Sequence, residues 1–586
     1  MLNQTSLRPE LRFDSTYTAV GSAAYEAAVG RIRLYAAALS RTDAEALCGE
    51  ALEAEIDRCG KAFDELDSLL AFVRLSETVD DVSSRPEEAG EVLHGLLQQL
   101  LRASGPLARR TARAAAANPG SRMLTAADHA FGRIHHAWLQ SVGEELRDFI
   151  QLMRVTCFWP LTASYEHLLR LLTPEVRTEE GLTRRLSFAQ CLIQFRSTPE
   201  REMRRRIFEG LNRQAAVLAP SFADLLNSIE GVRLLMYRHT GADFRRTPFA
   251  HADVSFAAWE AMRRVLRRHL PEIRRTVSER AQAFGPRKMQ PYDLLAGAPF
   301  AKKRLMTPAQ ALAFCAEAGS AVSPDFEAFV FRLAEERSIE MRASFTRTGE
   351  AYSVPLGVFG RVCMVSPFAN DIESALVLSR VLGEAWVQKT LLALPRFERE
   401  VSPLVTAAAG ALHETLARRC WLRKAGPQSR AEVVWHHQRA LATALLNWSV
   451  RTDFEMRFLE ERASGIVGVR RIKTLLASAW QDWYGDTTEA PDGSLWITQK
   501  HFYDTHRFMA PAVDAMGCLL SHLLVDRLTA EPERFPAAYE AFLLASGRSG
   551  ADALFREQFG LTLADEAVWE HALESALRPF EPASGS

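Results

Sequence analysis

An arginine and a glutamate stand four residues apart in a largely apolar stretch, "SALVLSRVLGEAWVQKTL" (Ser374–Leu391). On a helix, Arg380 and Glu384 lie on one face and can form an ion pair. Two interpretations stay open. The pair fills space in a buried helix and satisfies its own charges, or the guanidinium is a fixed positive charge that holds a carboxylate, a phosphate or a polarised carbonyl. In the second case Glu384 is a candidate acid or base.

Other chemistry finds little support in the sequence. There is no Gly-x-x-x-x-Gly-Lys phosphate loop, no Gly-x-Gly-x-x-Gly after a strand, and no Gly-x-Ser-x-Gly elbow. The eight cysteines are scattered and never form Cys-x-x-Cys, which is typical of reduced core thiols. Cys363 is the one cysteine near the candidate site, and a packed strand thiol is the expected role. Adjacent histidines at 135–136 and 436–437 point about 100° apart on a helix, so neither pair chelates a metal by itself.

Composition limits the partners. The chain has 586 residues, with 71 basic and 72 acidic side chains, so it has no global field that would attract nucleic acid or an anionic membrane. The basic run Arg196–Arg206 has the spacing of an amphipathic helix with interspersed glutamates, which indicates a solvated face. No N-terminal signal pattern and no apolar window of membrane-spanning length occurs. We expect a cytoplasmic protein.

The elements that must position the pair are mainly helices. Apolar residues recur at three- and four-residue spacing from Ala23 to about Asn118 and again after Leu391. Thr198 and Pro199 predict a helix start, as N-cap and first helical residue. Glycines and prolines predict an internal connection over 284–308. One β element is expected at 341–367. We divide the chain into a helical lobe (1–195), a second helical lobe (196–580) and a disordered tail (581–586).

A small β element that leads into a buried helix, within a long helical chain, resembles the oligoendopeptidase F branch of the thimet oligopeptidase family of zinc peptidases. The segments that carry the resemblance occur in the family's order, and they are "LRFDSTYTAV", "YDLLAGAP", "RTGEAYSVP", "SVRTDFEMRFLEERASG" and "HFYDTHRFM". The resemblance covers nearly the whole chain. It implies a mainly α, two-lobed oligopeptidase fold, as in thimet oligopeptidase and neurolysin, with a deep central cleft and one small β-sheet.

The zinc motif of that family is degenerate in this chain. In the family, the core helix carries His-Glu-x-x-His, whose histidines share a zinc ion while the glutamate activates the bound water. Here Arg380 and Glu384 stand at the two histidine positions. The third ligand position, a glutamate in the family, aligns with Ala407 when Glu414 is the anchor. A shifted alignment would let His413 or Glu414 supply a ligand. We expect no metal ligands, no zinc and no peptide hydrolysis by the family mechanism.

The resemblance also names other candidate residues. In the family, the His-Phe-Tyr segment faces the cleft, which makes His501 and Tyr503 tentative catalytic residues beside Arg380 and Glu384. Candidate substrate-binding residues are Gly349, Tyr352, His413, Glu414 and His506. The strand that contains Gly349 and Tyr352 borders the substrate in the family, and strand addition needs no metal. The tyrosine-rich stretch that supplies oxyanion donors in the family is missing after Tyr503.

Three functions follow from these features. The first is a metal-independent protein that binds a peptide-like or aminoacyl substrate and transforms it, with the biosynthesis of a peptide natural product as a suitable setting. The second is a non-catalytic pseudopeptidase that binds a peptide or scaffolds a protein partner. The third is a residual metallopeptidase with displaced ligands. The expected partner in the first two is a peptide or a peptide-like ligand, without nucleic acid or membrane.

Overall fold

The computed structural model describes residues 10–13, 16–79, 85–135, 142–177, 181–285, 288–301, 305–342, 350–505 and 509–578. The chain forms two compact units, each built from three separate stretches. Unit 1 comprises Met1–Val155, Arg304–Ala417 and Leu524–Leu561, and unit 2 comprises Thr156–Lys303, Arg418–Leu523 and Thr562–Ser586. The boundary expected between residues 195 and 196 falls inside unit 2. Gly349, His506 and the tail at 581–586 lie outside the described residues.

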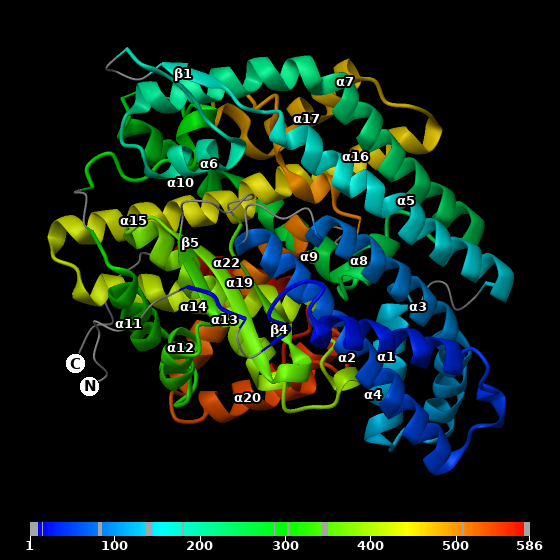
Figure 1. The fold of residues 1–586 in the computed structure, drawn as a ribbon. Coiled ribbons are helices and arrows are strands. Elements are labelled where there is room, and N and C mark those ends of the chain that lie inside the picture. Colours follow the sequence, from blue (N-terminus) through cyan, green and yellow to red (C-terminus); the bar gives the residue numbers. More distant parts are fainter. Residues whose placement is uncertain are drawn as a thin grey trace. The chain divides into compact units, whose positions relative to one another are not determined.

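Unit 1 combines long helices with a three-stranded sheet (Figure 1). Its helices are α1 (Ala23–Leu39), α2 (Gly49–Val79), α3 (Arg85–Ala117), α4 (Arg122–Ile134), α11 (Pro308–Gly319), α12 (Phe326–Glu335), α13 (Ile372–Leu391), α20 (Phe535–Ala545) and α21 (Ala551–Phe559), with 3-10 turns η1 (Ala44–Ala46), η4 (Gly357–Phe359) and η5 (Arg396–Glu398). Its strands are β3 (Ile339–Arg342), β4 (Tyr352–Leu356) and β5 (Arg361–Phe368).

Unit 2 is almost entirely helical. Its helices are α6 (Phe188–Ser197), α7 (Arg201–Thr240), α8 (Thr247–His251), α9 (Phe256–Arg268), α10 (Leu270–Gln282), α15 (Pro427–Ala442), α16 (Trp448–Ser464), α17 (Val469–Tyr484), α18 (Leu495–Thr498) and α22 (Glu566–Leu577), with a π-helical segment η6 (Thr443–Asn447) and 3-10 turns η3 (Pro291–Asp293), η7 (Gly485–Thr487) and η8 (Lys500–Tyr503). Strands β1 (Glu175–Arg177) and β2 (Thr183–Arg185) form a hairpin. Helices α5 (Glu144–Arg170), α14 (Pro403–Lys424) and α19 (Ala510–Ala530) contain residues of both units.

Strand β5 is the centre of the sheet in unit 1. It pairs in parallel with β3 and antiparallel with β4, in the order β3-β5-β4. Successive residues of a strand point to opposite faces. Cys363 and Val365 accordingly join the apolar cluster of α1–α4, whereas Val362 and Met364 join that of α11–α13. Both faces of β5 are therefore buried, and the expected role of Cys363 as a packed strand thiol is confirmed.

The mainly helical fold class is confirmed. The described residues of the segment 341–367 include the end of β3, all of β4 and most of β5. The connection at 284–308 is also confirmed, because α11 begins only at Pro308 and a 3-10 turn is the one regular element before it in the described part of that segment. The hairpin β1–β2 was not predicted. Its strands have three residues each and expose nearly all their side chains, so they lack the apolar alternation that predicts a strand.

Two details at the start of α7 differ from expectation. The helix begins at Arg201, with Glu200 as an N-cap that makes no side-chain cap hydrogen bond, so Thr198 and Pro199 precede it. The basic run is not wholly solvated, because Arg204 is only 1% exposed and forms an ion pair with the buried Asp293 at 2.8 Å. Arg204 is buried because its partner, Asp293, is a buried acid more than eighty residues away in the sequence. Helical periodicity does not reveal such a distant partner.

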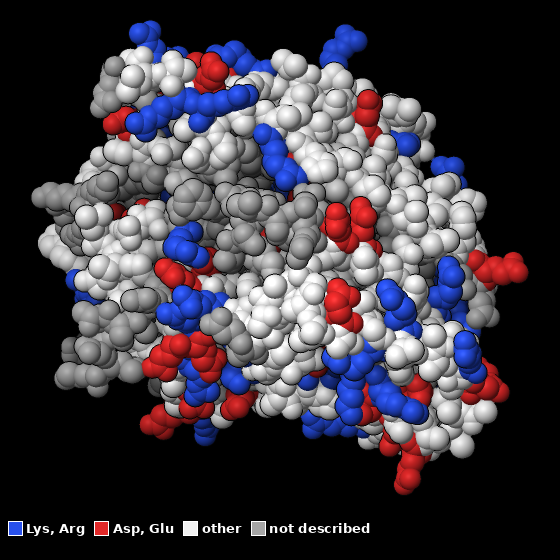
Figure 2. All heavy atoms as spheres, viewed as in Figure 1, with Lys and Arg blue, Asp and Glu red and all other residues white. Residues whose placement is uncertain are grey.

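The charge distribution on the surface and the hydropathy of the helices can be compared with the expectation that neither nucleic acid nor a membrane is a partner. On the face drawn in Figure 2, acidic and basic side chains are interspersed, in keeping with the near-equal totals of both signs. Among the helices in the described ranges, none is both long enough and apolar enough to cross a membrane.

Candidate functional site

Helix α13 carries the arginine and the glutamate that stand four residues apart. Asp371 caps the helix by accepting a hydrogen bond from the Ser374 backbone N–H at 2.8 Å, which fixes where the helix begins. The helical register then places Arg380 Nε 3.5 Å from Glu384 Oε1. The guanidinium also lies 3.7 Å from Glu414 Oε2 on α14. The side chains of these three residues are 20–23% exposed, so they form a partly exposed cluster of one cation and two carboxylates.

Gly410 explains how α14 approaches this cluster. A Cβ atom at Gly410 would lie 2.9 Å from Glu384 Oε1 and 3.1 Å from Arg380 Cγ, closer than side-chain atoms normally pack. The stems of Arg380 and Glu384 thus occupy the space that a side chain at position 410 would need. Ala407, which aligns with the family's third ligand position, is buried, and Gly410 is the residue of α14 whose backbone lies against the pair. The small-residue run "TAAAGA" at 406–411 is the sequence signal for such a close helix approach.

His413 lies on α14 beside Glu414 but faces an apolar slot. Its side chain is fully buried, and its ring centroid is 4.4 Å from that of Phe326. Neither ring nitrogen has a hydrogen-bond partner within the described ranges. Burial lowers the pKa of His413 to about 3, so the imidazole is neutral at physiological pH. Cβ atoms at Gly319 or Gly383 would collide with this ring, so the two glycines form the slot that holds it.

Tyr352 begins β4, which is an edge strand of the described sheet. Its hydroxyl is 2.7 Å from Thr78 Oγ1, and the Arg74 guanidinium lies 3.9 Å from the ring centroid. Burial raises the pKa of Tyr352. The side chain is therefore anchored to α2, while the next residue's carbonyl accepts a hydrogen bond from Gln388 on α13 at 3.2 Å.

His501 and Tyr503 belong to unit 2, in the 3-10 turn η8. Tyr503 is fully buried, stacks on Tyr165 with ring centroids 4.2 Å apart, and packs edge-on against Phe222. Burial raises its pKa well above that of a free tyrosine. His501 is partly buried, with its ring 4.0 Å from that of Phe502. The structure brings together Arg380, Glu384 and Glu414. The catalytic roles of His501 and Tyr503 stay predictions.

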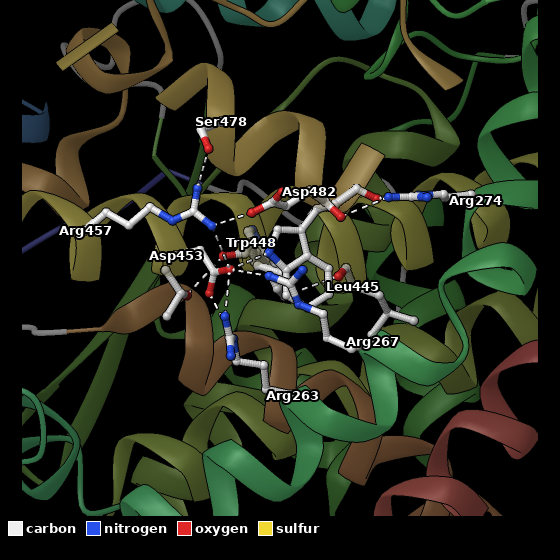
Figure 3. A network of polar contacts seen from close by, with 12 residues as sticks. Arg263, Arg267, Arg274, Leu445, Trp448, Asp453, Arg457, Ser478 and Asp482 are labelled. Carbon is white, nitrogen blue, oxygen red and sulfur yellow. Dashed lines mark hydrogen bonds and ion pairs between the residues drawn. The ribbon is translucent and has the colours of Figure 1, made fainter. Parts of the chain in front are cut away.

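Helix α16 holds a charge network that the sequence patterns did not predict (Figure 3). Asp453 is only 4% exposed and accepts hydrogen bonds from Arg263 and Arg267 of α9 at 2.7–3.1 Å. The Trp483 indole N–H on α17 donates to the same carboxylate at 2.9 Å. These bonds tie α16 to both neighbouring helices. Nothing in the sequence distinguishes Asp453 from the other acidic residues of the chain, so its burial and its partners were not predicted.

The resemblance implies zinc, and the donors of this cluster can be tested against that expectation. Zinc in proteins is bound by cysteine, histidine and carboxylate side chains, usually four ligands or three with a water. Arg380 cannot ligate a cation, and its charge lies between the two carboxylates. His413 faces Phe326 in its own slot. In the described ranges no three potential ligands converge. These residues do not fit the family's zinc ion, and the absence of zinc from the protein stays a prediction.

Comparisons with known proteins identify the fold. No sequence-family model and no curated protein matches the chain. Among solved structures, Pz peptidase A, determined with an inhibitor, is 12% identical and has a TM-score of 0.75, with 94% of this chain and 96% of that chain covered. Oligoendopeptidase F from Enterococcus faecium is 13% identical, with a TM-score of 0.66 and coverage of 95% and 96%. An M32 carboxypeptidase from Deinococcus radiodurans is 14% identical, with a TM-score of 0.56 and coverage of 90% and 99%. The chain therefore has the fold of oligoendopeptidase F.

Proposed function

We propose that this protein binds a peptide-like or aminoacyl ligand without a metal, and that Arg380, Glu384 and Glu414 hold its amino-terminal unit. The observation that carries the proposal is the partial exposure of all three side chains. A pair that only filled the space of a lost metal would need no access to solvent, because its two charges would satisfy each other. Here the guanidinium and both carboxylates are partly exposed to solvent, so a ligand can contact them as well.

The chemistry of the three side chains indicates the class of ligand. A guanidinium only donates hydrogen bonds, and an ionised carboxylate only accepts them. A group with a strong donor next to a strong acceptor matches this set. The α-ammonium and first carbonyl of an aminoacyl unit are such a group, with the ammonium directed at Glu384 or Glu414 and the carbonyl oxygen at Arg380. The names of the structurally similar proteins, Pz peptidase A and oligoendopeptidase F, are those of peptidases and support the same class of ligand.

The residues also define what chemistry is open to the site. A guanidinium that donates to a carbonyl oxygen polarises it, and a carboxylate beside it can accept a proton from an attacking group. Glu384 is the candidate for that acceptor. A role in the biosynthesis of a peptide natural product suits this arrangement and stays a prediction.

The test uses a pentapeptide library with a C-terminal fluorophore and a free amino terminus, together with the same library after N-acetylation. Fluorescence anisotropy gives the affinity of each, in buffer that contains a chelator. We expect acetylation to weaken binding about tenfold or more, because it removes a charge-assisted hydrogen bond. Arg380→Met and Glu414→Gln should each weaken binding of the free peptides by a similar factor.

The matched control is Arg205→Met, which removes an arginine from an i,i+4 ion pair with Glu209 on the exposed surface of α7. It should leave peptide affinity unchanged. Equal binding of free and acetylated peptides by the wild type would refute the proposal, as would full binding by Arg380→Met. Mass spectrometry of the incubated peptides then separates conversion from binding alone.

A further inference from the structure

Unit 2 contains a pocket that the proposed function does not use. Helices α6, α7 and α17 and the turns around 291–295 and 492–499 line it, and about 90 Å³ of it can hold the centre of a water molecule. A single buried water needs roughly 10–15 Å³, so the pocket holds several water-sized positions. Most of its lining is apolar and includes Phe195, Phe208, Tyr292 and Leu495. Such a pocket suits an aromatic or branched aliphatic body.

One charged side chain of the pocket lacks an ion pair. Arg451, on α16, lines the pocket, and its guanidinium forms no ion pair with a described carboxylate. Its Nε is buried without a hydrogen-bond partner. The charged residues that act on Arg451 are two acids, Asp492 and Asp514, and one base, Arg196. Burial lowers the pKa of Arg451 to about 10, so it remains a cation at neutral pH.

The backbone beside Arg451 is unusual. The segment Thr443–Asn447, which leads into α16, is a π-helix, and both of these end residues line the pocket. Single π-helical turns inside α-helices are rare and frequently accompany functional sites. Asn447 hydrogen-bonds the Tyr484 hydroxyl through its side chain, but its Oδ1 is buried without a hydrogen-bond partner, as is Arg451 Nε. Two polar atoms that line an apolar pocket are therefore left without a hydrogen bond, which costs stability unless something binds there.

Asp492 lies at the same side but is already engaged. Its Oδ1 accepts hydrogen bonds from the Ser494 backbone N–H at 3.0 Å and from Ser494 Oγ at 2.9 Å. Figure 3 shows the Asp453 network, which holds α16 against α9 and α17 two residues after Arg451. Arg451 therefore belongs to a turn of α16 that is fixed by its neighbours, and its side chain lines the pocket.

We propose that this pocket binds a small hydrophobic carboxylic acid, whose carboxylate contacts Arg451 and whose ring or branched chain lies among the apolar side chains. A guanidinium matches a carboxylate in geometry and charge. The site lies within unit 2 and shares no residue with the cluster of Arg380, so the two proposals stand or fall separately.

The experiment titrates the full-length protein with three small probes and follows binding by ligand-observed saturation-transfer NMR. Phenylacetate has the ring and the charge, phenylacetamide has the ring alone, and acetate has the charge alone. We expect phenylacetate to bind about tenfold or more tightly than either of the others, because the site needs both parts. Inorganic phosphate should not compete with it.

Three variants test the residues. Arg451→Met should weaken phenylacetate about tenfold and leave phenylacetamide unchanged. Arg470→Met is the matched control, because Arg470 is an exposed arginine on α17 outside the pocket, and it should change neither affinity. Leu192→Trp fills the cavity from α6 and should abolish binding of both ring compounds while Arg451 remains.

Several results would overturn the proposal. These are equal affinity for phenylacetate and phenylacetamide, equal affinity for phenylacetate and acetate, or unchanged phenylacetate binding by a folded Arg451→Met variant. Absence of phenylacetate binding to the wild type would also overturn it. Arg380→Met should bind phenylacetate like the wild type, so failure of this proposal is distinguishable from failure of the proposed peptide site.

Discussion

Replacing His413 by leucine tests whether this histidine is a packed core residue or an available ligand. The imidazole is fully buried against Phe326, and neither nitrogen has a partner within the described ranges. Leucine has a similar volume and no polar atoms, so the substitution removes an unsatisfied polar group that costs about 1–3 kcal/mol. We therefore expect His413→Leu to be as stable as the wild type at neutral pH, or more stable.

The pH dependence of the free energy of unfolding gives a more specific number for the effect of His413. The native pKa of His413 is lowered to about 3, whereas an unfolded histidine titrates near 6.5. Stability from the neutral imidazole is therefore present above about pH 6.5 and is lost as the pH falls below it, because only the unfolded chain takes up the proton. Between about pH 7.5 and 5.5 this loss amounts to about 1.4 kcal/mol, and His413→Leu should lack it.

Urea titrations of both proteins at the two pH values measure the difference, with hydrogen exchange of the 403–417 segment as a local readout. His167→Gln is the control, because it removes a histidine that is exposed and lies outside the core. A variant that is less stable by about 2 kcal/mol at neutral pH, with the wild-type pH dependence intact, would show that the imidazole makes a polar interaction and refute the reasoning.

Three further outcomes follow from the structure. Asp453→Asn should lower the free energy of unfolding by about 2 kcal/mol or more in urea titrations, because it weakens charge-assisted bonds to two arginines and an indole. Gly410→Ala should cost about 1–3 kcal/mol and weaken peptide binding, since its Cβ displaces Glu384, whereas Gly95→Ala, with open space, should be neutral or stabilising by thermal melting. Burial, with a nearby carboxylate, raises the pKa of Glu455 to about 8, so the wild type loses stability as the pH rises from about 4.5 through 8 and Glu455→Gln should lose less.

Helical periodicity, the glycine-rich connection and the β-branched segment were sufficient to predict the fold class. The run of helices, the connection at 284–308 and the β element at 341–367 each depend on local spacing, which a sequence displays directly. The hairpin β1–β2 was missed because its short strands lack apolar alternation. The burial of Arg204 was missed because its partner, Asp293, comes from a distant turn.

The candidate site was predictable only where it lies on one helix. The i,i+4 spacing of Arg380 and Glu384 implies their contact, and the structure adds Glu414 from the next helix. The contact with Gly410 and the apolar slot of His413 depend on how α13 and α14 pack, which spacing within either helix does not determine. The role of Arg451 was likewise not predictable, because only the structure shows that this arginine lines a pocket and that its Nε has no hydrogen-bond partner.

The most direct test of the account measures binding of the free-amine pentapeptides to the wild type and to Arg380→Met, in a chelator and again in buffer with added zinc. The account predicts that the wild type binds equally well in both buffers and that Arg380→Met binds about tenfold or more weakly in both. Binding that appears only with zinc, or that is unaffected by the loss of Arg380, would contradict it.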